Sequence, residues 1–209
     1  MSAKKRAKLG KIISSAVNQI DQWNTSNKKA SLQLDSITNM RGQLDGLPSE
    51  RASLSEKQSK LGVLADVPGL VPRLQATIVG SRERAYKFIQ EELKTMEEIV
   101  ECISRQFQQV ERIYADLYDL EGYEAVHTRT HVSFSVVDFM EWFRQLKMYL
   151  FQEHQHKLFL VSKLVETDFT AMQQLTIDWQ TSNAFKIQEI YGFLRYTVEQ
   201  HSFLQLEDN

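Results

Sequence analysis

Histidines are the side chains of this sequence best suited to bind a metal ion. His127 and His131 are four residues apart with Glu124 nearby, a spacing that could bring ligands together on one face of a helix. The threonines and the valine in this stretch are poor helix formers, however, and no third strong ligand is evident. We therefore expect no metal site in this segment.

Two Glu-x-x-His spacings match the motif that di-metal helical bundles use in pairs. Glu124 with His127 falls in an expected loop. Glu153 with His156 falls in a polar interval of an expected helix, where a solvated face is the better explanation. The chain also contains no glycine-rich phosphate loop, paired-cysteine motif, nucleophile elbow or HExxH pattern. We expect no catalytic residues, no cofactor and no enzymatic activity.

The only cysteine, Cys102, excludes a disulfide within the chain. It lies among Ile99, Val100 and Ile103 in a helical pattern, which indicates a small buried apolar side chain. A reactive thiol is the minor alternative.

The overall composition is typical of a globular protein, with 42% apolar and 25% charged residues. A net charge of -2 and a pI near 6.2 provide no general attraction to nucleic acid, so we do not expect direct nucleic-acid binding. The N-terminus lacks the apolar core of a signal peptide, and charges interrupt the longest apolar region. We expect an intracellular, soluble protein without a membrane partner.

Positive charge is concentrated at the start of the chain. No acidic residue occurs before Asp21, whereas five basic residues precede it, namely Lys4, Lys5, Arg6, Lys8 and Lys11. Residues 1–8 need not be ordered. The segment fits a solvated helix start, a nuclear-import patch or a weak phosphate contact, and the sequence does not choose among them.

Two long segments carry apolar residues at alternating steps of four and three, the spacing of a heptad seam. The first seam contains Leu9, Ile13, Ala16, Ile20, Trp23, Asn27, Ala30, Leu34, Ile37, Arg41 and Leu44. The second contains Ile89, Leu93, Met96, Val100, Ile103, Phe107, Val110, Tyr114 and Leu117. Together they predict a long, coiled-coil-like antiparallel hairpin over residues 9–121. Whether the seams pair within one chain or between chains stays open.

Glycines and prolines mark the ends of these segments. Gly46 and Pro48 end the first helix, and a short helix from about Ser49 to Leu61 follows. The prolines of residues 66–72 predict a turn before a helix that starts near Leu70, with an interruption expected around residues 80–81. Gly122 is expected to stop that helix and to begin a loop over residues 122–134.

The segment from Ser135 to Thr167 predicts a central helix whose first half is apolar on nearly every side. Ser135 and Asp138 have the spacing of a capping box. A short helix after Asp168 and an aromatic-rich last helix complete the second half, over residues 135–205. The fold class is therefore all-α, an elongated helical bundle, and we expect one domain over residues 1–209.

Three stretches resemble a known family. They are VERIYADLYDLEGYEAVHTRTHVSFSVVDFMEWFRQLKMYL at 110–150, ADVPGLVPRLQATIV at 65–79 and, more weakly, DFTAMQQLTIDW at 168–179. In their order and spacing they resemble a small animal ribosome-maturation factor that partners hexameric AAA-type ATPases related to valosin-containing protein. The first stretch is the most specific of the three.

This resemblance implies a non-enzymatic adaptor that binds an AAA ATPase hexamer and a second small helical protein of the cyclin-dependent-kinase-interacting type. The assembly would act on the cytoplasmic precursor of the large ribosomal subunit, so that contact with the pre-ribosomal particle is indirect. It also implies a cytoplasmic and nuclear location. The family offers no catalytic motif to transfer onto this chain.

Exposed aromatic residues around the start of the central helix are the first candidates for a partner interface: Phe134, Phe139, Trp142 and Phe143. The same residues could instead belong to the core. An alternative function, supported by the heptad seams, is a structural coiled-coil subunit of a cytoskeletal, tethering or kinetochore-type assembly. The two functions predict different oligomeric states, because the alternative requires seams that pair between chains.

Overall fold

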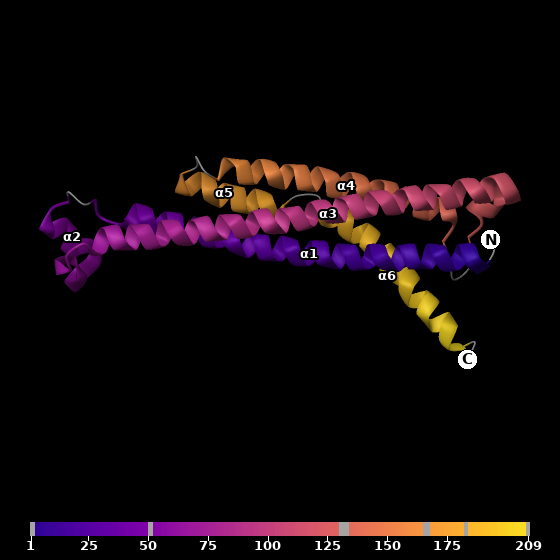
Figure 1. The fold of residues 1–209 in the computed structure, drawn as a ribbon, viewed down its shortest axis with the longest axis horizontal. Coiled ribbons are helices and arrows are strands. Elements are labelled where there is room, and N and C mark those ends of the chain that lie inside the picture. Colours follow the sequence, from indigo (N-terminus) through magenta and orange to yellow (C-terminus); the bar gives the residue numbers. More distant parts are fainter. Residues whose placement is uncertain (1–2, 50–51, 130–133, 165–167, 182–183, 208–209) are drawn as a thin grey trace.

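The computed structural model describes residues 3–49, 52–129, 134–164, 168–181 and 184–207, with side chains described from residue 5 to residue 200. The ordered elements are α1 (Ala3–Gly46), α2 (Leu54–Leu61), a 3-10 helix η1 (Gly62–Asp66), α3 (Leu70–His127), α4 (Val136–Lys163), α5 (Phe169–Gln180) and α6 (Ala184–Glu207). The described residues contain no strand. The expected all-α, elongated bundle is confirmed (Figure 1).

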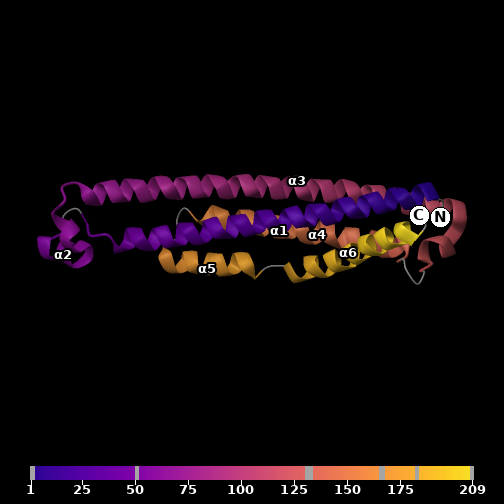
Figure 2. The same cartoon turned by 90° about the horizontal axis from the view of Figure 1, so that it is seen from below.

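Helices α1 and α3 run antiparallel along most of the length of the molecule (Figures 1 and 2). The first seam faces inward, with Ile20, Ala30 and Leu34 almost completely buried. Side chains join the two helices at intervals: Gln106 Nε2 donates to Ser15 Oγ over 2.8 Å. The two helices that carry the predicted seams therefore pair within one chain, joined by α2 and η1 at the end far from the N-terminus (Figure 1).

Several element bounds differ from the sequence-based expectations. The short helix α2 begins at Leu54 rather than near Ser49. Helix α1 already begins at Ala3, so most of the basic start is helical. Helix α3 continues without a break through residues 80–81. It also continues past Gly122 to His127, so the expected loop over residues 122–134 was wrong for its first part. Gly122 does interrupt the long helix as expected, because its φ of 81° and ψ of -176° are not helical, but a second helical segment follows it instead of a loop.

His127 lies beside an aromatic ring in the helical segment that follows Gly122. Its ring stacks on Tyr123, with centroids 4.0 Å apart. His131, the other histidine considered for a metal site, lies outside the described residues. Among the residues that the structure describes, no three His, Cys, Asp or Glu side chains are grouped so that they could hold a metal ion.

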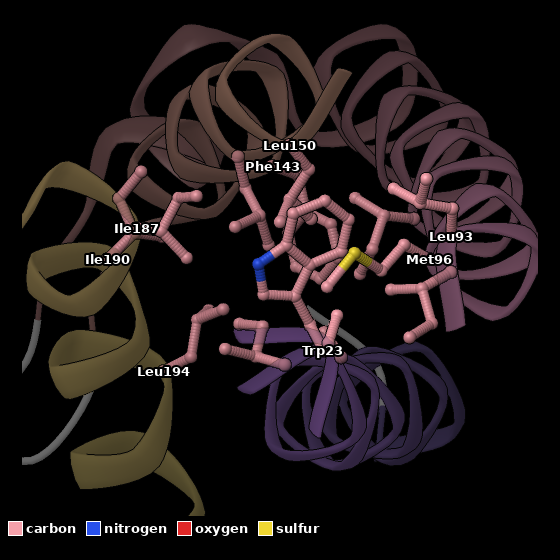
Figure 3. Packing of buried hydrophobic residues seen from close by; sticks show 14 of the residues in the cluster. Trp23, Leu93, Met96, Phe143, Leu150, Ile187, Ile190 and Leu194 are labelled. Carbon is pink, nitrogen blue, oxygen red and sulfur yellow. The ribbon is translucent and has the colours of Figure 1, made fainter. Parts of the chain in front are cut away.

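Helix α4 packs along α3, while α5 and α6 pack against α1 (Figure 2). Trp23 reaches from α1 into the middle of a shared cluster of buried side chains (Figure 3). Its other labelled members come from three helices: Leu93 and Met96 from α3, Phe143 and Leu150 from α4, and Ile187, Ile190 and Leu194 from α6. The apolar first half of α4 is thus covered on its inner side by the other helices of the chain.

Polar contacts fix α5 and α6 on α1. Tyr191 of α6 donates a hydrogen bond from its hydroxyl to Asp21 over 2.8 Å, and burial followed by this bond raises the pKa of Tyr191. The Oγ1 atoms of Thr38 and Thr176 lie 3.3 Å apart and join α5 to the same helix. The outer end of α6 then diverges from the bundle (Figure 1).

Two residues in the polar interval of α4, Glu153 and Lys157, are buried, which corrects the expectation that Glu153 lies on a solvated face. Glu153 and Lys157 are 3% and 1% exposed, and their charged atoms lie 2.8 Å apart. Lys157 Nζ also donates to the carbonyl oxygen of Trp179 over 3.0 Å and lies 4.2 Å from the centre of its ring. Burial lowers the pKa of Lys157, and the Glu153 carboxylate opposes this shift. Lys157 therefore fastens α5 to α4.

Candidate interaction surface

An aromatic cluster joins the start of α4 to the middle of α6. Phe134 packs edge-on against Trp142, with ring centroids 4.7 Å apart, and lies at a similar angle to Phe193 and Tyr196. Trp142 stacks on Phe193 with centroids 5.0 Å apart. Phe139 completes the cluster through edge contacts with Phe134 and Trp142. We call these five residues the aromatic cluster.

The four predicted interface residues do not share one environment. Phe143 is fully buried in the core shown in Figure 3, and Phe139 is buried at the base of the aromatic cluster. Phe134 and Trp142 are half-buried. The exposed edge of the cluster instead belongs to α6, where Phe193 is 39% and Tyr196 49% exposed. The interface assignment itself stays a prediction.

The sequence-based candidates did not include Phe193 and Tyr196, since only aromatic residues around the start of the central helix were considered. Their separation of three residues places both on one helical face, which was the available clue. What the sequence did not contain was their position beside Phe134, more than fifty residues earlier in the chain. Only the packing of α6 near the start of α4 brings these groups together.

A network of hydrogen bonds around Asp138 stabilises the first turn of α4 beside this cluster. Asp138 Oδ2 accepts hydrogen bonds from the Ser135 amide over 2.9 Å and from Arg129 Nε over 2.8 Å, while Ser135 Oγ accepts the Asp138 amide. The predicted capping box is confirmed. Partial burial would raise the pKa of Asp138, but its hydrogen bonds with Arg129 and Ser135 together outweigh burial and hold it below the usual value.

We expect Asp138→Asn to destabilise the protein by about 1 kcal/mol at pH 7, the usual cost of weakening a helix cap. The pKa of Asp138 is lower in the folded state, so its contribution is complete above the carboxyl pKa of the unfolded chain. It is lost as the pH falls through the folded pKa. Urea denaturation of both proteins between pH 7 and pH 2 measures this difference.

Glu141→Gln is a suitable control for this experiment, because Glu141 is on the same helix and also pairs with an arginine, but on the surface and outside the cap. Its stability difference should be small at every pH. A difference for Asp138→Asn that persists unchanged at the acid end would contradict a role for the ionised carboxylate.

The other candidate groups are dispersed. Cys102 is half-buried rather than buried, and Gln106 Nε2 lies 3.6 Å from its sulfur. His154 is buried and hydrogen-bonds through Nε2 to the carbonyl oxygen of Leu93. His156, the partner of Glu153 in the Glu-x-x-His spacing, is half-exposed, whereas Glu153 pairs with Lys157. None of the described helices has the length and apolar character of a membrane span.

Comparison with known proteins identifies the family to which the chain belongs. No curated protein matches the chain. A family model described as CA109-like, Ribosome biogenesis protein C1orf109-like, matches residues 4–194, from the start of α1 to the middle of α6. Because the match covers far more than half of the sequence, the chain belongs to the C1orf109-like family of ribosome biogenesis proteins.

Proposed function

We propose that this chain is a non-enzymatic adaptor subunit of an AAA ATPase complex that acts in maturation of the large ribosomal subunit precursor. In this role it binds the ATPase hexamer and a second small helical protein, of the cyclin-dependent-kinase-interacting type. Family membership supports the ribosomal part of the proposal. The resemblance carried by residues 65–79, 110–150 and 168–179 supports the part that concerns the two partners.

The observation that carries the adaptor role is the partly exposed aromatic cluster. Aromatic side chains often dominate binding energy at protein interfaces, where they become fully desolvated. Phe193 and Tyr196 offer such side chains on a rigid helix, and Trp142 supports Phe193 from beneath by stacking. Their exposed edge suits a partner that covers α6 beside the start of α4.

We expect the double substitution Phe193→Ala/Tyr196→Ala to reduce recovery of the partners about tenfold or more, as loss of a central aromatic contact does. The measurement is affinity purification of the tagged chain from cells, with quantification of co-purifying AAA ATPase subunits, the small helical partner and large-subunit precursors. Melting temperatures of the purified variants must stay close together for the comparison to hold.

Phe185→Ala is the matched control, since Phe185 is on the same helix, 80% exposed and outside the aromatic cluster. Its partner recovery should equal that of the unsubstituted chain. If no AAA ATPase co-purifies with any of the three proteins, the adaptor role is wrong. If the ATPase is recovered equally with all three, the aromatic cluster is not the surface that binds it.

The proposal also assigns the protein to both the cytoplasm and the nucleus. Imaging of the full chain and of a variant without residues 1–11 tests this location and the nuclear-import interpretation of the basic start. Exclusion of only the shortened protein from the nucleus would favour an import patch over a solvated helix start.

A further inference from the structure

A groove of about 480 Å³ lies between α3 and α4. Its apolar lining consists mainly of Val100 and Phe107 from α3 and of Met148 and Phe151 from α4. None of its lining residues belongs to the aromatic cluster. The groove is therefore a separate feature of the surface.

Both walls of the groove have the spacing of a helix-packing seam. On α4 the lining residues Arg144, Met148, Phe151 and Gln155 follow one another at steps of four, three and four. On α3 the lining residues Glu97, Val100, Ser104 and Phe107 follow at steps of three, four and three. Two neighbouring helices that each present such a row toward the same groove form a surface on which a third helix can pack.

In the described part of the chain, the groove between α3 and α4 is exposed to solvent. Phe151 is 53% and Met148 39% exposed, and the row on α4 continues to Leu158, which is 41% exposed. These three large apolar side chains share one row, which Gln155 interrupts between Phe151 and Leu158, and they differ from the single exposed apolar residues that are common on protein surfaces. An apolar helix face of matching width would cover this row.

The charged residues that line the groove are distributed unevenly along its length. Lys147 Nζ lies 5.3 Å from the centre of the Phe107 ring, and His154 bonds to Leu93, so α3 and α4 are antiparallel here. Glu97 and Glu101 consequently lie at one end of the groove, while Arg144 and Lys147 lie at the other.

Two of these charges already have partners on their own helices. Glu101 pairs with Arg105 over 3.8 Å, and Arg144 pairs with Glu141 over 2.7 Å. Exposed pairs of this kind are weak and exchange readily with other ions. The acidic end of the groove also favours the positive end of a helix dipole, and the basic end favours the negative end.

We propose that this groove binds an amphipathic helix of a partner protein, oriented with its N-terminal end at Glu97 and Glu101. The helix carries basic side chains in its first turn, acidic side chains in its last turn and an apolar stripe between them. The lined length from Glu97 to Phe107 corresponds to about 15 Å, or roughly three helical turns. The inference goes beyond the adaptor role, because any partner helix of this chemistry would satisfy it.

A peptide library tests the proposal on the full chain. The library displays 14-residue helices with a fixed apolar stripe and random residues in the first and last turns. Selected peptides are measured by fluorescence anisotropy against the unsubstituted protein and Phe151→Asp. We expect enrichment of Lys and Arg in the first turn and of Asp and Glu in the last turn. We also expect Phe151→Asp to weaken binding by about tenfold or more, as a charge at an interface centre does.

Phe185→Asp is the matched control, because it places the same charge on an exposed phenylalanine far from the groove, and it should bind the peptides normally. Absence of binders, equal binding to Phe151→Asp, or the opposite charge bias would overturn the proposal. A homodimer seen by light scattering that Phe151→Asp dissociates would also overturn it, because a second copy would then occupy the groove. Unchanged melting of Phe151→Asp shows that lost binding is not lost folding.

Discussion

Replacing Lys157 with methionine is expected to destabilise the protein by about 3–5 kcal/mol, because it leaves the buried Glu153 carboxylate without its cation. Both side chains are almost completely inaccessible to solvent, so water cannot replace the lost partner. The same substitution removes the hydrogen bond to the Trp179 carbonyl and the contact with its ring. Urea denaturation at pH 7, followed by circular dichroism, measures the loss.

A double variant separates the charge from the contacts with α5. Glu153→Leu/Lys157→Met removes both charges, and such apolar replacement of a buried pair is often neutral or stabilising. The Trp179 carbonyl still loses its donor, at a cost of about 1–3 kcal/mol, so we expect partial recovery relative to Lys157→Met alone. Lys163→Met, on the exposed part of the same helix, should change stability by less than about 0.5 kcal/mol. A double variant as unstable as the single one would show that the contacts of Lys157 with Trp179, rather than the charge on Glu153, dominate.

Signals confined to a few neighbouring residues predicted most of the helices. Ser135 and Asp138 have the spacing of a capping box, and Asp168 caps α5 as the sequence indicated. The heptad seam of α1 was readable in the same way, because apolar side chains at steps of three and four leave little choice of buried face. The seam predicted for α3 was only partly right: Val100, Phe107 and Tyr114 are half-buried, whereas Ile99 and Ile113, outside the predicted seam, belong to the core. At Gly122 the local signal was half right, since the glycine interrupts the long helix but is followed by a second helical segment rather than a loop.

Features that depend on contacts between distant segments could not be predicted. Glu153 and Lys157 are four residues apart, the spacing of an ordinary exposed ion pair on a helix. Only the docking of α5, through Trp179, covers them and changes their role. The groove between α3 and α4 likewise requires Phe107 and Phe151 to come together from different helices. Neither arrangement leaves a trace in the sequence around the residues involved.

Replacing Phe143 with alanine is expected to destabilise the protein by about 3–5 kcal/mol, the usual range for removing a fully buried aromatic side chain. Phe143 packs in the cluster shown in Figure 3, where α1, α3 and α6 contribute neighbours. For a chain of this size, 1 kcal/mol corresponds to about 2–4 °C, so the melting temperature should fall by at least about 6 °C.

This substitution also decides between the two roles considered for Phe143. A core role predicts lower stability, with partner recovery reduced only in proportion to the unfolded fraction. An interface role predicts lost recovery at an unchanged melting temperature, and that result would contradict the burial of the side chain. Phe185→Ala is the matched control: its ring is 80% exposed, so its removal opens no cavity. Phe143 is the most deeply buried of the four interface candidates. The losses of stability and of partner recovery measured for Phe143→Ala can therefore be compared with those of a substitution at the half-buried Trp142.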